Sequence, residues 1–385
     1  MPHGSLSSTA ASPGSQESHG PRNRKPHLLL IGPRIIENNV IGGDMVQFEG
    51  LIGNLERRAR IELTVISTAR LRARRNRAGR ARLDAATFVN TLVLLWRHAP
   101  TADVVVWYVS SRAAILGGGV VWLVCTLHRL PLSIRFFGGS FDARLASAAG
   151  IWRFIAARTF LRADVLFCQT RRLATALGAA CTTAWLPNTR DMPPRRQPYR
   201  RACRRLLFLS RLLPEKGLPE LLEAAPRFPA RVRLSVFGPE MPGFDVRAIS
   251  RLSNVTFGGP VAPKHVPAVM EDHDALVLPT YYHDEGYPGV VIEAFQMGLP
   301  AVATRLPGLR ELMTDGKDGL HVAAGSVDSL VDAVARLCSD DQLFERLRRG
   351  ALETGERYRG DRAAAAIEDL CRRAATPGED TGGGV

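Results

Sequence analysis

Residues 279–304 read PTYYHDEGYPGVVIEAFQMGLPAVAT, which is the most informative stretch of the chain. It begins at the end of a short apolar run, 275–279, that has the composition of a buried strand. A polar loop follows, and residues 289–297 then have the pattern of a helix bounded by a Pro and a Gly. Residues 301–304 begin another apolar strand. The order strand, loop, helix, strand indicates a parallel α/β unit.

Two carboxylates belong to this unit: Glu285 lies in the loop, and Glu293 lies near the end of the first helical turn. Both can therefore face the same strand-to-helix junction. The free N–H groups at a helix N-terminus attract phosphate, whereas carboxylates accept hydrogen bonds from hydroxyls. A junction that offers both suits a sugar joined to a phosphate. The alternative is that the two acids only complement the helix dipole.

Strand and helix patterns alternate along the rest of the chain, which predicts two doubly wound parallel sheets. Apolar runs predict strands at 27–33, 61–66, 104–109, 132–137, 164–168, 183–186, 206–209, 232–237, 255–257, 275–279, 301–304 and 319–322. The Pro- and Arg-rich segment 191–205 interrupts the pattern and is interpreted as a linker. We expect a first domain over 27–190 and a second over 206–359, with a last helix, 360–373, that packs back on the first. Within the first domain, an Arg-rich loop is expected before a helix over Ala85 to Arg97, and a loop over Gly138 to Asp142.

The length of 385 residues allows two domains with sizeable cores, and 45% apolar content is typical of a globular protein. The six Cys are scattered without a CxxC pair, which argues against zinc and disulfides and fits a reducing cytosol. Residues 1–26 lack an apolar core, so they are expected to be a disordered tail rather than a signal peptide or anchor. The end, 374–385, is expected to be loose as well.

The net charge of +14 comes mainly from Arg, with ten Arg against one acid between Arg57 and Arg82. This charge suits an anionic membrane face or nucleic acid, and the alternative is the Arg usage of a GC-rich genome spread over solvated faces. Nucleic-acid binding is disfavoured because Arg70 to Arg82 contains no aromatic residues. The apolar segment 113–127 is too short for a membrane span and is expected to be a core helix.

A second group of charged residues lies in the loop SRLLPEKG, residues 210–217, which follows a predicted strand and precedes a helix. It places Arg211 and Lys216 at the carboxyl end of that strand. Two cations and a helix N-terminus can stabilise the charge that develops on a departing diphosphate without a metal. The alternative is a pair of solvated basic residues.

SRLLPEKG, followed about 70 residues later by EGYPGVVIEAFQMGLPAVAT, resembles the retaining glycosyltransferases of family 4, which have the GT-B fold. The resemblance extends over most of 27–373 through the N-terminal Gly pair, RFFGGSFD, WLPN, VTFGGPV and DALVLPT. It is most specific in the second domain. RFFGGSFD is also similar to transferases of bacterial surface-polysaccharide assembly.

The resemblance implies roles for individual residues. Arg211 and Lys216 would hold the donor diphosphate, and Glu285 would bind the donor sugar hydroxyls as the third catalytic residue. The other donor-binding residues would be Glu293 at the ribose, the N–H groups of Gly289, Val290 and Val291 at the phosphate, Gly238 and Val261 at the base, and Gly42 and Gly43 from the first domain. The acceptor would lie near Gly138, Gly139 and Asp142.

Such enzymes use a nucleotide diphosphate sugar, linked to UDP or GDP, keep the anomeric configuration and need no cofactor or metal. Many of them carry a His in the first-domain loop, but residues 135–139 here are RFFGG. The acceptor would be a glycan or lipid-linked intermediate, and the enzyme would be cytoplasmic or peripheral on the inner membrane face. The alternatives are a nucleotide-sugar epimerase or another GT-B enzyme such as a phosphorylase, although the cofactor lysine setting of a phosphorylase is not seen.

Overall fold

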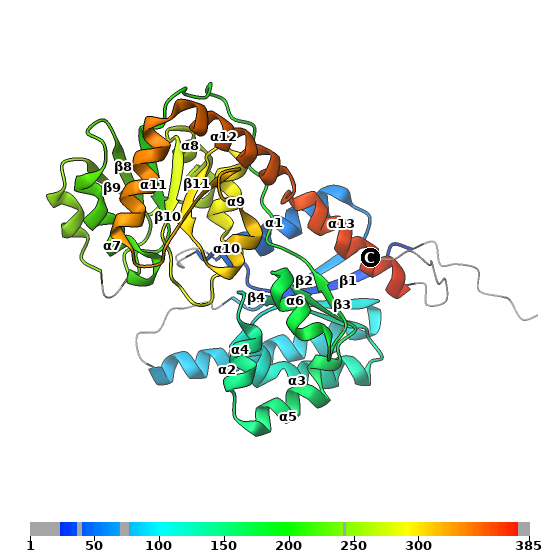
Figure 1. The fold of residues 1–385 in the computed structure, drawn as a ribbon. Helices are drawn as coiled ribbons and strands as arrows, with labels where there is room; N and C mark the ends of the chain where they lie inside the picture. Colours follow the sequence, from blue (N-terminus) through cyan, green and yellow to red (C-terminus); the bar gives the residue numbers. More distant parts are fainter. Residues whose placement is uncertain (1–23, 37–40, 70–76, 242–243, 376–385) are drawn as a thin grey trace, which may run out of the picture.

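The computed structural model describes residues 24–36, 41–69, 77–241 and 244–375. The expected tails, 1–26 and 374–385, therefore lie almost entirely outside the described residues. The described chain forms two lobes, each built on a six-stranded parallel sheet (Figure 1). Within the described ranges, no helix is both long and apolar enough to cross a bilayer.

The first sheet has the strand order β2-β1-β3-β4-β5-β6. Its strands are β1 (His27–Gly32), β2 (Glu62–Ser67), β3 (Val104–Ser110), β4 (Leu132–Phe137), β5 (Val165–Cys168) and β6 (Thr183–Trp185). Val104 to Val109 is buried at every position, as expected for a parallel strand covered on both faces.

The first lobe's helices are α1 (Gly43–Arg58), α2 (Arg77–His98), α3 (Ser111–Leu127), α4 (Phe141–Ser147), α5 (Gly150–Arg158) and α6 (Arg171–Gly178). Helix α1 packs with the last helix of the chain, α13 (Gly360–Ala375), and their apolar side chains share one core with one face of the sheet. The opposite face of the sheet packs on a second core with α2, α3 and α5. Arg58 and Glu368 fasten α13 to α1 by two hydrogen bonds of 2.8 and 2.9 Å.

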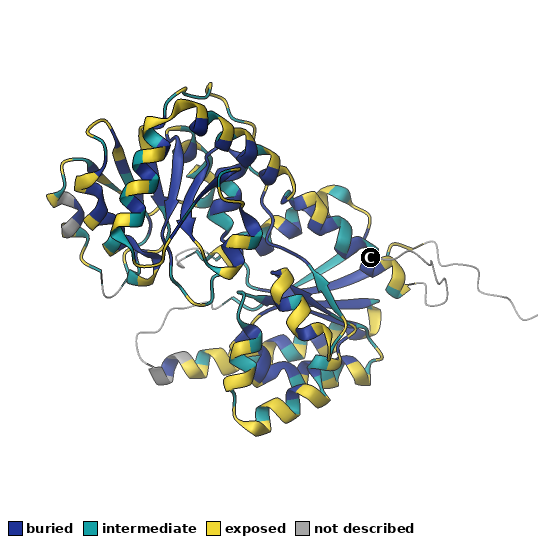
Figure 2. Ribbon diagram, in the orientation of Figure 1, coloured by how far each residue is buried: buried dark blue, intermediate teal, exposed yellow. Residues whose placement is uncertain are grey.

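The second sheet has the order β12-β11-β10-β7-β8-β9. Its strands are β7 (Arg205–Leu209), β8 (Arg233–Phe237), β9 (Val255–Gly259), β10 (Ala275–Leu278), β11 (Ala301–Thr304) and β12 (Gly319–Val322). Its helices are α7 (Leu218–Ala224), α8 (Val266–Glu271), α9 (Gly289–Gln296), α10 (Pro307–Leu312), α11 (Val327–Ser339) and α12 (Asp341–Glu356). The strands are buried and the helices expose their outer faces (Figure 2). Short 3₁₀ helices occur at Ala99–Thr101, Phe160–Arg162, Pro214–Lys216, Ala225–Arg227, Val246–Arg251 and Pro263–His265.

All twelve predicted strands are present, and the prediction of two doubly wound parallel sheets is confirmed. Two local expectations are wrong. The Arg-rich segment does not remain a loop up to the helix predicted at Ala85, because α2 already begins at Arg77. The segment after β4 was expected to be a loop as far as Asp142, but α4 begins at Phe141, whose ring stacks on Phe136 inside the core.

Candidate active site

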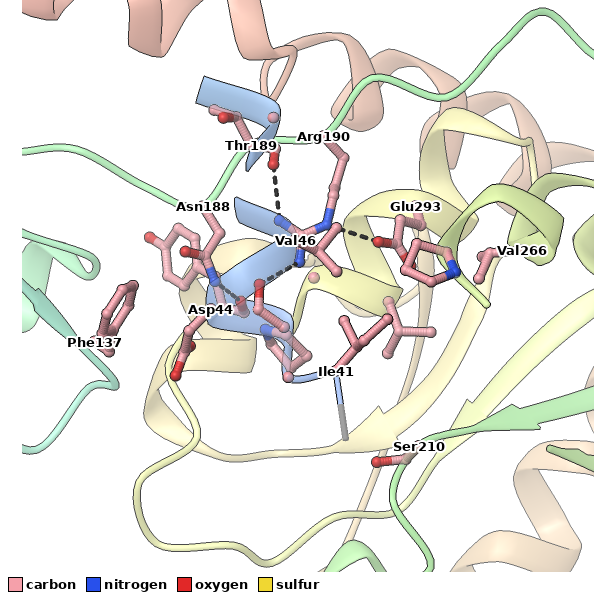
Figure 3. Close-up of a pocket in the computed structure, with 18 of the residues that line it drawn as sticks. Ile41, Asp44, Val46, Phe137, Asn188, Thr189, Arg190, Ser210, Val266 and Glu293 are labelled. Atoms are coloured by element: carbon pink, nitrogen blue, oxygen red, sulfur yellow. Dashed lines mark hydrogen bonds and ion pairs between the residues drawn. The ribbon is translucent and has the colours of Figure 1, made fainter. Parts of the chain in front are cut away.

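A cleft of about 1060 Å³ lies between the two lobes (Figure 3). Its lining residues follow the carboxyl ends of strands in both sheets: β1, β3, β4 and β5 in the first lobe, and β7, β8, β9 and β10 in the second. Ligands bind at this end of the strands in open α/β sheets. The cleft is therefore the candidate active site. Within the described ranges, no three side chains of His, Cys, Asp or Glu gather closely enough to hold a metal ion.

Lys216 and Glu285, which the sequence placed after two different strands, meet in this cleft. The Lys216 ammonium donates a short hydrogen bond to Glu285 Oε2, and the Thr280 hydroxyl donates to the same oxygen at 3.0 Å. The loop that carries Lys216 passes directly against the end of β10. Only glycine fits at Gly217, because its φ is +75° and a Cβ there would lie 2.1 Å from the Pro279 carbonyl oxygen. Both charged side chains are only about one-tenth exposed, at 9% and 11%. The pair is thus held rigidly at the cleft wall.

Glu293 projects from α9 and pairs with Arg190, a residue that the sequence did not single out. Arg190 Nε donates to Glu293 Oε1 at 2.6 Å. The same guanidinium donates to Gln47 Oε1 at 2.9 Å and to the carbonyl of Gly43 at 3.2 Å, both on α1 of the first lobe. Arg190 therefore joins the two lobes and fixes the orientation of the Glu293 carboxylate.

The N-terminus of α9 opens onto the cleft at Gly289 and Val290. A Cβ on Gly289 would lie 1.9 Å from the Arg190 guanidinium, so a larger residue here would displace that guanidinium. Val291 differs from expectation: its side chain is fully buried and its N–H donates to the Pro288 carbonyl at 3.1 Å. The N–H groups of Gly289 and Val290 are therefore the ones placed to meet an anion.

Arg211 and Asp44 face the cleft from opposite lobes. The Arg211 side chain has no hydrogen-bond or ion-pair partner among the described residues, so its charge is available to a ligand. Asp44 can be reached by water, yet the two lobes surround it. This enclosure raises the pKa of its carboxyl above 3.8, and the charges of Arg135, Arg211 and Arg190 partly oppose that rise.

The remaining donor-side residues also border the cleft: Gly42, Gly43, Gly238 and Val261. Gly238 has a φ of +147°, and a Cβ there would lie 1.7 Å from the Ser210 carbonyl oxygen. Because the backbone after β8 crosses directly over the loop that carries Arg211, only glycine fits this position. The structure thus brings together all of the donor residues predicted from the sequence except the side chain and N–H of Val291.

The predicted acceptor side is only partly exposed to the cleft. Gly138 lines it, with a φ of +83°. Asp142 instead forms two hydrogen bonds with Arg172, at 2.9 and 3.0 Å, and the carbonyl of Gly139 accepts a third from Arg172 at 2.7 Å. The Asp142 carboxylate and the Gly139 carbonyl are therefore occupied by Arg172 at the start of α6, and neither residue lines the cleft.

A buried arginine behind the cleft was also missed. Arg135 on β4 is fully buried and donates to Asn188 Oδ1 at 2.8 Å, while its Nε and Nη1 have no partner among the described residues. Burial lowers the pKa of its guanidinium. Asn188 in turn donates to the carbonyl of Tyr287 at 2.7 Å, just before α9. The sequence signal that could have identified this residue is an arginine inside the apolar run LSIRFF.

Comparisons with known proteins agree with this architecture. The family model for glycosyl transferases group 1 matches residues 203–340, which carry most of the second lobe. The GDP-mannose-dependent alpha-(1-6)-phosphatidylinositol monomannoside mannosyltransferase of Mycobacterium tuberculosis is 30% identical over 287 residues, covering 68% of this chain and 72% of that enzyme. The alpha-D-kanosaminyltransferase of Streptomyces kanamyceticus is 30% identical over 153 residues, covering 38% of this chain and 39% of that protein.

Solved structures share the fold at low sequence identity. Sucrose-phosphate synthase from Thermosynechococcus elongatus superposes with a TM-score of 0.71 at 17% identity, covering 91% of this chain and 99% of that one. Anabaena HepE in complex with UDP-glucose superposes with a TM-score of 0.66, also at 17% identity, covering 90% and 99%. The similarity to the mannosyltransferase is longer than either lobe, and the family model matches the lobe that carries Glu285 and Glu293. This chain is therefore an enzyme of the glycosyl transferases group 1 family.

Proposed function

We propose that the protein is a retaining glycosyltransferase that moves a sugar from a nucleotide diphosphate sugar to a hydroxyl acceptor. The observation that carries this proposal is the arrangement of one cleft wall. There, carboxylates suited to sugar and ribose hydroxyls lie beside cations and helix N–H groups suited to a diphosphate. HepE, which shares the fold, was solved in complex with UDP-glucose, and this supports a nucleotide diphosphate sugar as the donor.

In this proposal each group on the donor wall has one task. Glu285 accepts hydrogen bonds from the sugar hydroxyls, and its contacts with Lys216 and Thr280 keep it in register. Glu293, oriented by Arg190, accepts from the ribose hydroxyls. The diphosphate lies against Lys216, Arg211 and the first N–H groups of α9. We propose UDP or GDP as the nucleotide and no resident cofactor.

The transfer step follows from this placement. The bond between the anomeric carbon and the diphosphate oxygen breaks, and that oxygen takes the bonding electron pair. The acceptor hydroxyl oxygen forms the new bond from the same face, and its proton passes to the departing diphosphate. Lys216 and Arg211 stabilise the charge that develops on the leaving group, while Glu285 keeps the sugar in position. Retention of anomeric configuration follows from attack on the face that the leaving group vacates.

We propose a glycan or lipid-linked intermediate as the acceptor. The mannosyltransferase relative supports this class, because its name specifies a phosphatidylinositol monomannoside. The acceptor would enter beside Gly138, which is the predicted acceptor-side residue that lines the cleft.

A binding screen tests the donor assignment first. We would measure the thermal unfolding of the full chain with UDP, GDP, ADP and their common sugar conjugates. A ligand at a hundredfold excess over its Kd stabilises the native state by about 2.7 kcal/mol. A shift with one nucleotide identifies the base, and the absence of a shift with every nucleotide would contradict the donor site.

Turnover assays then test the residues. Lys216→Ala and Glu285→Ala should each lower nucleotide release in the presence of acceptor by roughly tenfold or more, as expected for a lost transition-state contact. Lys317→Ala and Glu353→Ala are matched controls. These two side chains form an exposed ion pair, with 3.8 Å between the Lys317 ammonium and the Glu353 carboxylate, and neither lines the cleft. Wild-type turnover in both cleft variants would refute the assignment. Conversion of the donor without acceptor would indicate an epimerase instead.

A further inference from the structure

Large apolar side chains are exposed on one part of the first lobe. Nine such side chains in the described residues are between 45% and 63% exposed, and all nine belong to α2, α3 and α5. They are Val89, Val93 and Trp96 on α2, Leu116, Val120, Leu123 and Leu127 on α3, and Ile151 and Phe154 on α5. We call this surface the apolar helix face.

The spacing of these residues shows that they form aligned stripes. Leu116, Val120, Leu123 and Leu127 follow one another at intervals of four, three and four residues, which places them on one side of α3. The residues on α2 and α5 follow the same three- and four-residue spacing. The apolar side chains are therefore gathered on outward faces rather than scattered over the surface.

Three consecutive glycines hold the three helices together. A Cβ on Gly117 would lie 2.7 Å from Phe88 of α2, and a Cβ on Gly119 would lie 3.2 Å from Ile155 of α5. Helix α3 thus packs closely against both neighbours. In Figures 1 and 2, α2, α3 and α5 lie together on the side of the first lobe away from α1 and α13, with exposed outer surfaces. The three stripes therefore lie on neighbouring helices.

The charge around this surface has one sign. Among the side chains that the structure describes, the exposed arginines are Arg82 and Arg97 on α2, Arg112 on α3, and Arg153 and Arg158 on α5, and the single acid on these helices is Asp84. Arg112 is exposed and lies one turn before Leu116 in the same stripe of α3, and it also lines the cleft. The guanidinium of Arg158 lies 4.8 Å from the centre of the Phe154 ring. Apolar and cationic groups are thus interleaved.

We propose that the apolar helix face docks on an anionic lipid bilayer, with its apolar side chains among the acyl chains and its arginines at the phosphates. Exposed apolar stripes bordered by arginine are the features that an anionic interface binds. A second copy of the chain fits less well, because pairing two such faces would bring like charges together with almost no acid to offset them.

This assignment coincides only in part with the membrane contact that we expected at Arg57 to Arg82, because Arg82 lies on α2 but the start of that segment lies elsewhere. Arg58 and Arg60 are paired with Glu368, and Arg57 with Asp191 at 3.7 Å. These residues lie with α1 and α13, on the other side of the first sheet. Residues 70–76 lie outside the described residues. Among the arginine side chains of that segment that the structure describes, Arg82 is the one on the helices that carry the apolar helix face.

Vesicle flotation of the full chain tests the proposal without nucleotide or acceptor. The probes are vesicles of phosphatidylcholine alone and of phosphatidylcholine mixed with phosphatidylglycerol. Leu123→Asn/Leu127→Asn reduces the apolar stripe, and Arg153→Gln/Arg158→Gln reduces the charge. Arg336→Gln/Arg346→Gln, on exposed positions of α11 and α12, is the matched control. Thermal melts of every variant check that the fold is intact.

We expect the wild type and the control to float with the mixed vesicles far more than with phosphatidylcholine alone. The double Leu variant should lose roughly tenfold or more in partition coefficient, and each neutralised Arg about fivefold. Absence of flotation on mixed vesicles, or wild-type flotation by both face variants, would overturn the proposal. So would a dimer that the Leu substitutions dissociate without any vesicle binding, since it would assign the face to a second copy. None of these outcomes depends on the proposed transfer reaction.

Discussion

Replacing Arg190 with Met removes a guanidinium that joins the two lobes inside the cleft. Arg190 is 6% exposed as a side chain, pairs with Glu293 at 2.6 Å, and donates to Gln47 and to the Gly43 carbonyl on the other lobe. Met keeps an unbranched apolar stem, is shorter than Arg, and supplies no donor. Glu293 is then left as a nearly buried carboxylate without its counter-ion.

The structure sets the size of the expected effect. Removing one partner of a buried ion pair costs about 3–5 kcal/mol, because the other charge stays buried and unpaired. Glu293 is 13% exposed and borders the water of the cleft, so we expect the lower end, about 3 kcal/mol. Arg190→Met can be combined with Glu293→Gln, which removes the carboxylate charge, in a double-mutant cycle. The losses in unfolding free energy of the two single variants should not add in the double variant, and the coupling energy should be about 1–2 kcal/mol.

Urea unfolding of the wild type, the two single variants and the double variant measures the coupling energy. Titration with the preferred nucleotide diphosphate measures binding. Loss of the orienting guanidinium should raise the nucleotide Kd about tenfold, the equivalent of one hydrogen bond to a charged group. Arg58→Met is the matched control. It breaks the pair with Glu368, which is 3% exposed and remote from the cleft, so stability should fall while the nucleotide Kd stays unchanged.

Three results would refute this reasoning. Unchanged urea midpoints for Arg190→Met would mean that the ion pair does not contribute to stability. Additive costs in the cycle would mean that Arg190 and Glu293 act independently. An unchanged nucleotide Kd, in a variant with lowered stability, would restrict Arg190 to a structural role and remove the proposed orientation of the ribose-binding carboxylate.

Three further predictions concern residues outside the reaction itself. Burial raises the pKa of Asp318, so its ionisation costs stability at neutral pH and the cost fades as the pH drops towards 3.8. Asp318→Asn should therefore have the higher urea midpoint near pH 7, with the advantage shrinking in acid; an advantage that grows in acid would contradict this. Native-state thiol labelling should be fast at no more than the two partly exposed thiols, Cys181 and Cys338, and labelling of all six before unfolding would contradict the burial of the others. Gly308→Ala should lower turnover by roughly tenfold or more, because a Cβ would lie 2.2 Å from the Gly286 carbonyl oxygen and displace the loop that carries Glu285; wild-type turnover would show that the loop adapts.

The fold could be predicted because parallel strands covered on both faces are continuous apolar runs. The run VVVWYV gives β3, and ALVL gives β10, each buried at every one of these positions. The meeting of Lys216 with Glu285 could also be predicted, since residues after neighbouring parallel strands share one edge of the sheet. In both cases a local pattern determines the position.

The parts that could not be predicted depend on contacts between the lobes. Arg190 follows WLPN at the edge of an Arg-rich linker, where an arginine is usually solvated, and it is buried only because α1 and α9 close around it. Asp142 lay in a sequence that suggested a ligand loop, but Arg172, thirty residues later, occupies it. Sequence spacing does not report pairings at such separations.

Helix α3 connects the proposed chemistry to the proposed membrane surface. It begins at Ser111 and Arg112, which line the cleft, and its exposed stripe runs from Leu116 to Leu127. At about 1.5 Å per residue, the seventeen residues of α3 span about 25 Å. If the stripe lies in the lipid interface, the cleft mouth at Arg112 is within that distance of the headgroups. A lipid-borne acceptor could then reach the cleft without leaving the bilayer. Arg112→Gln should therefore impair transfer to a lipid-borne acceptor more than transfer to a water-soluble glycan with the same terminal sugar, and equal losses would argue against this route.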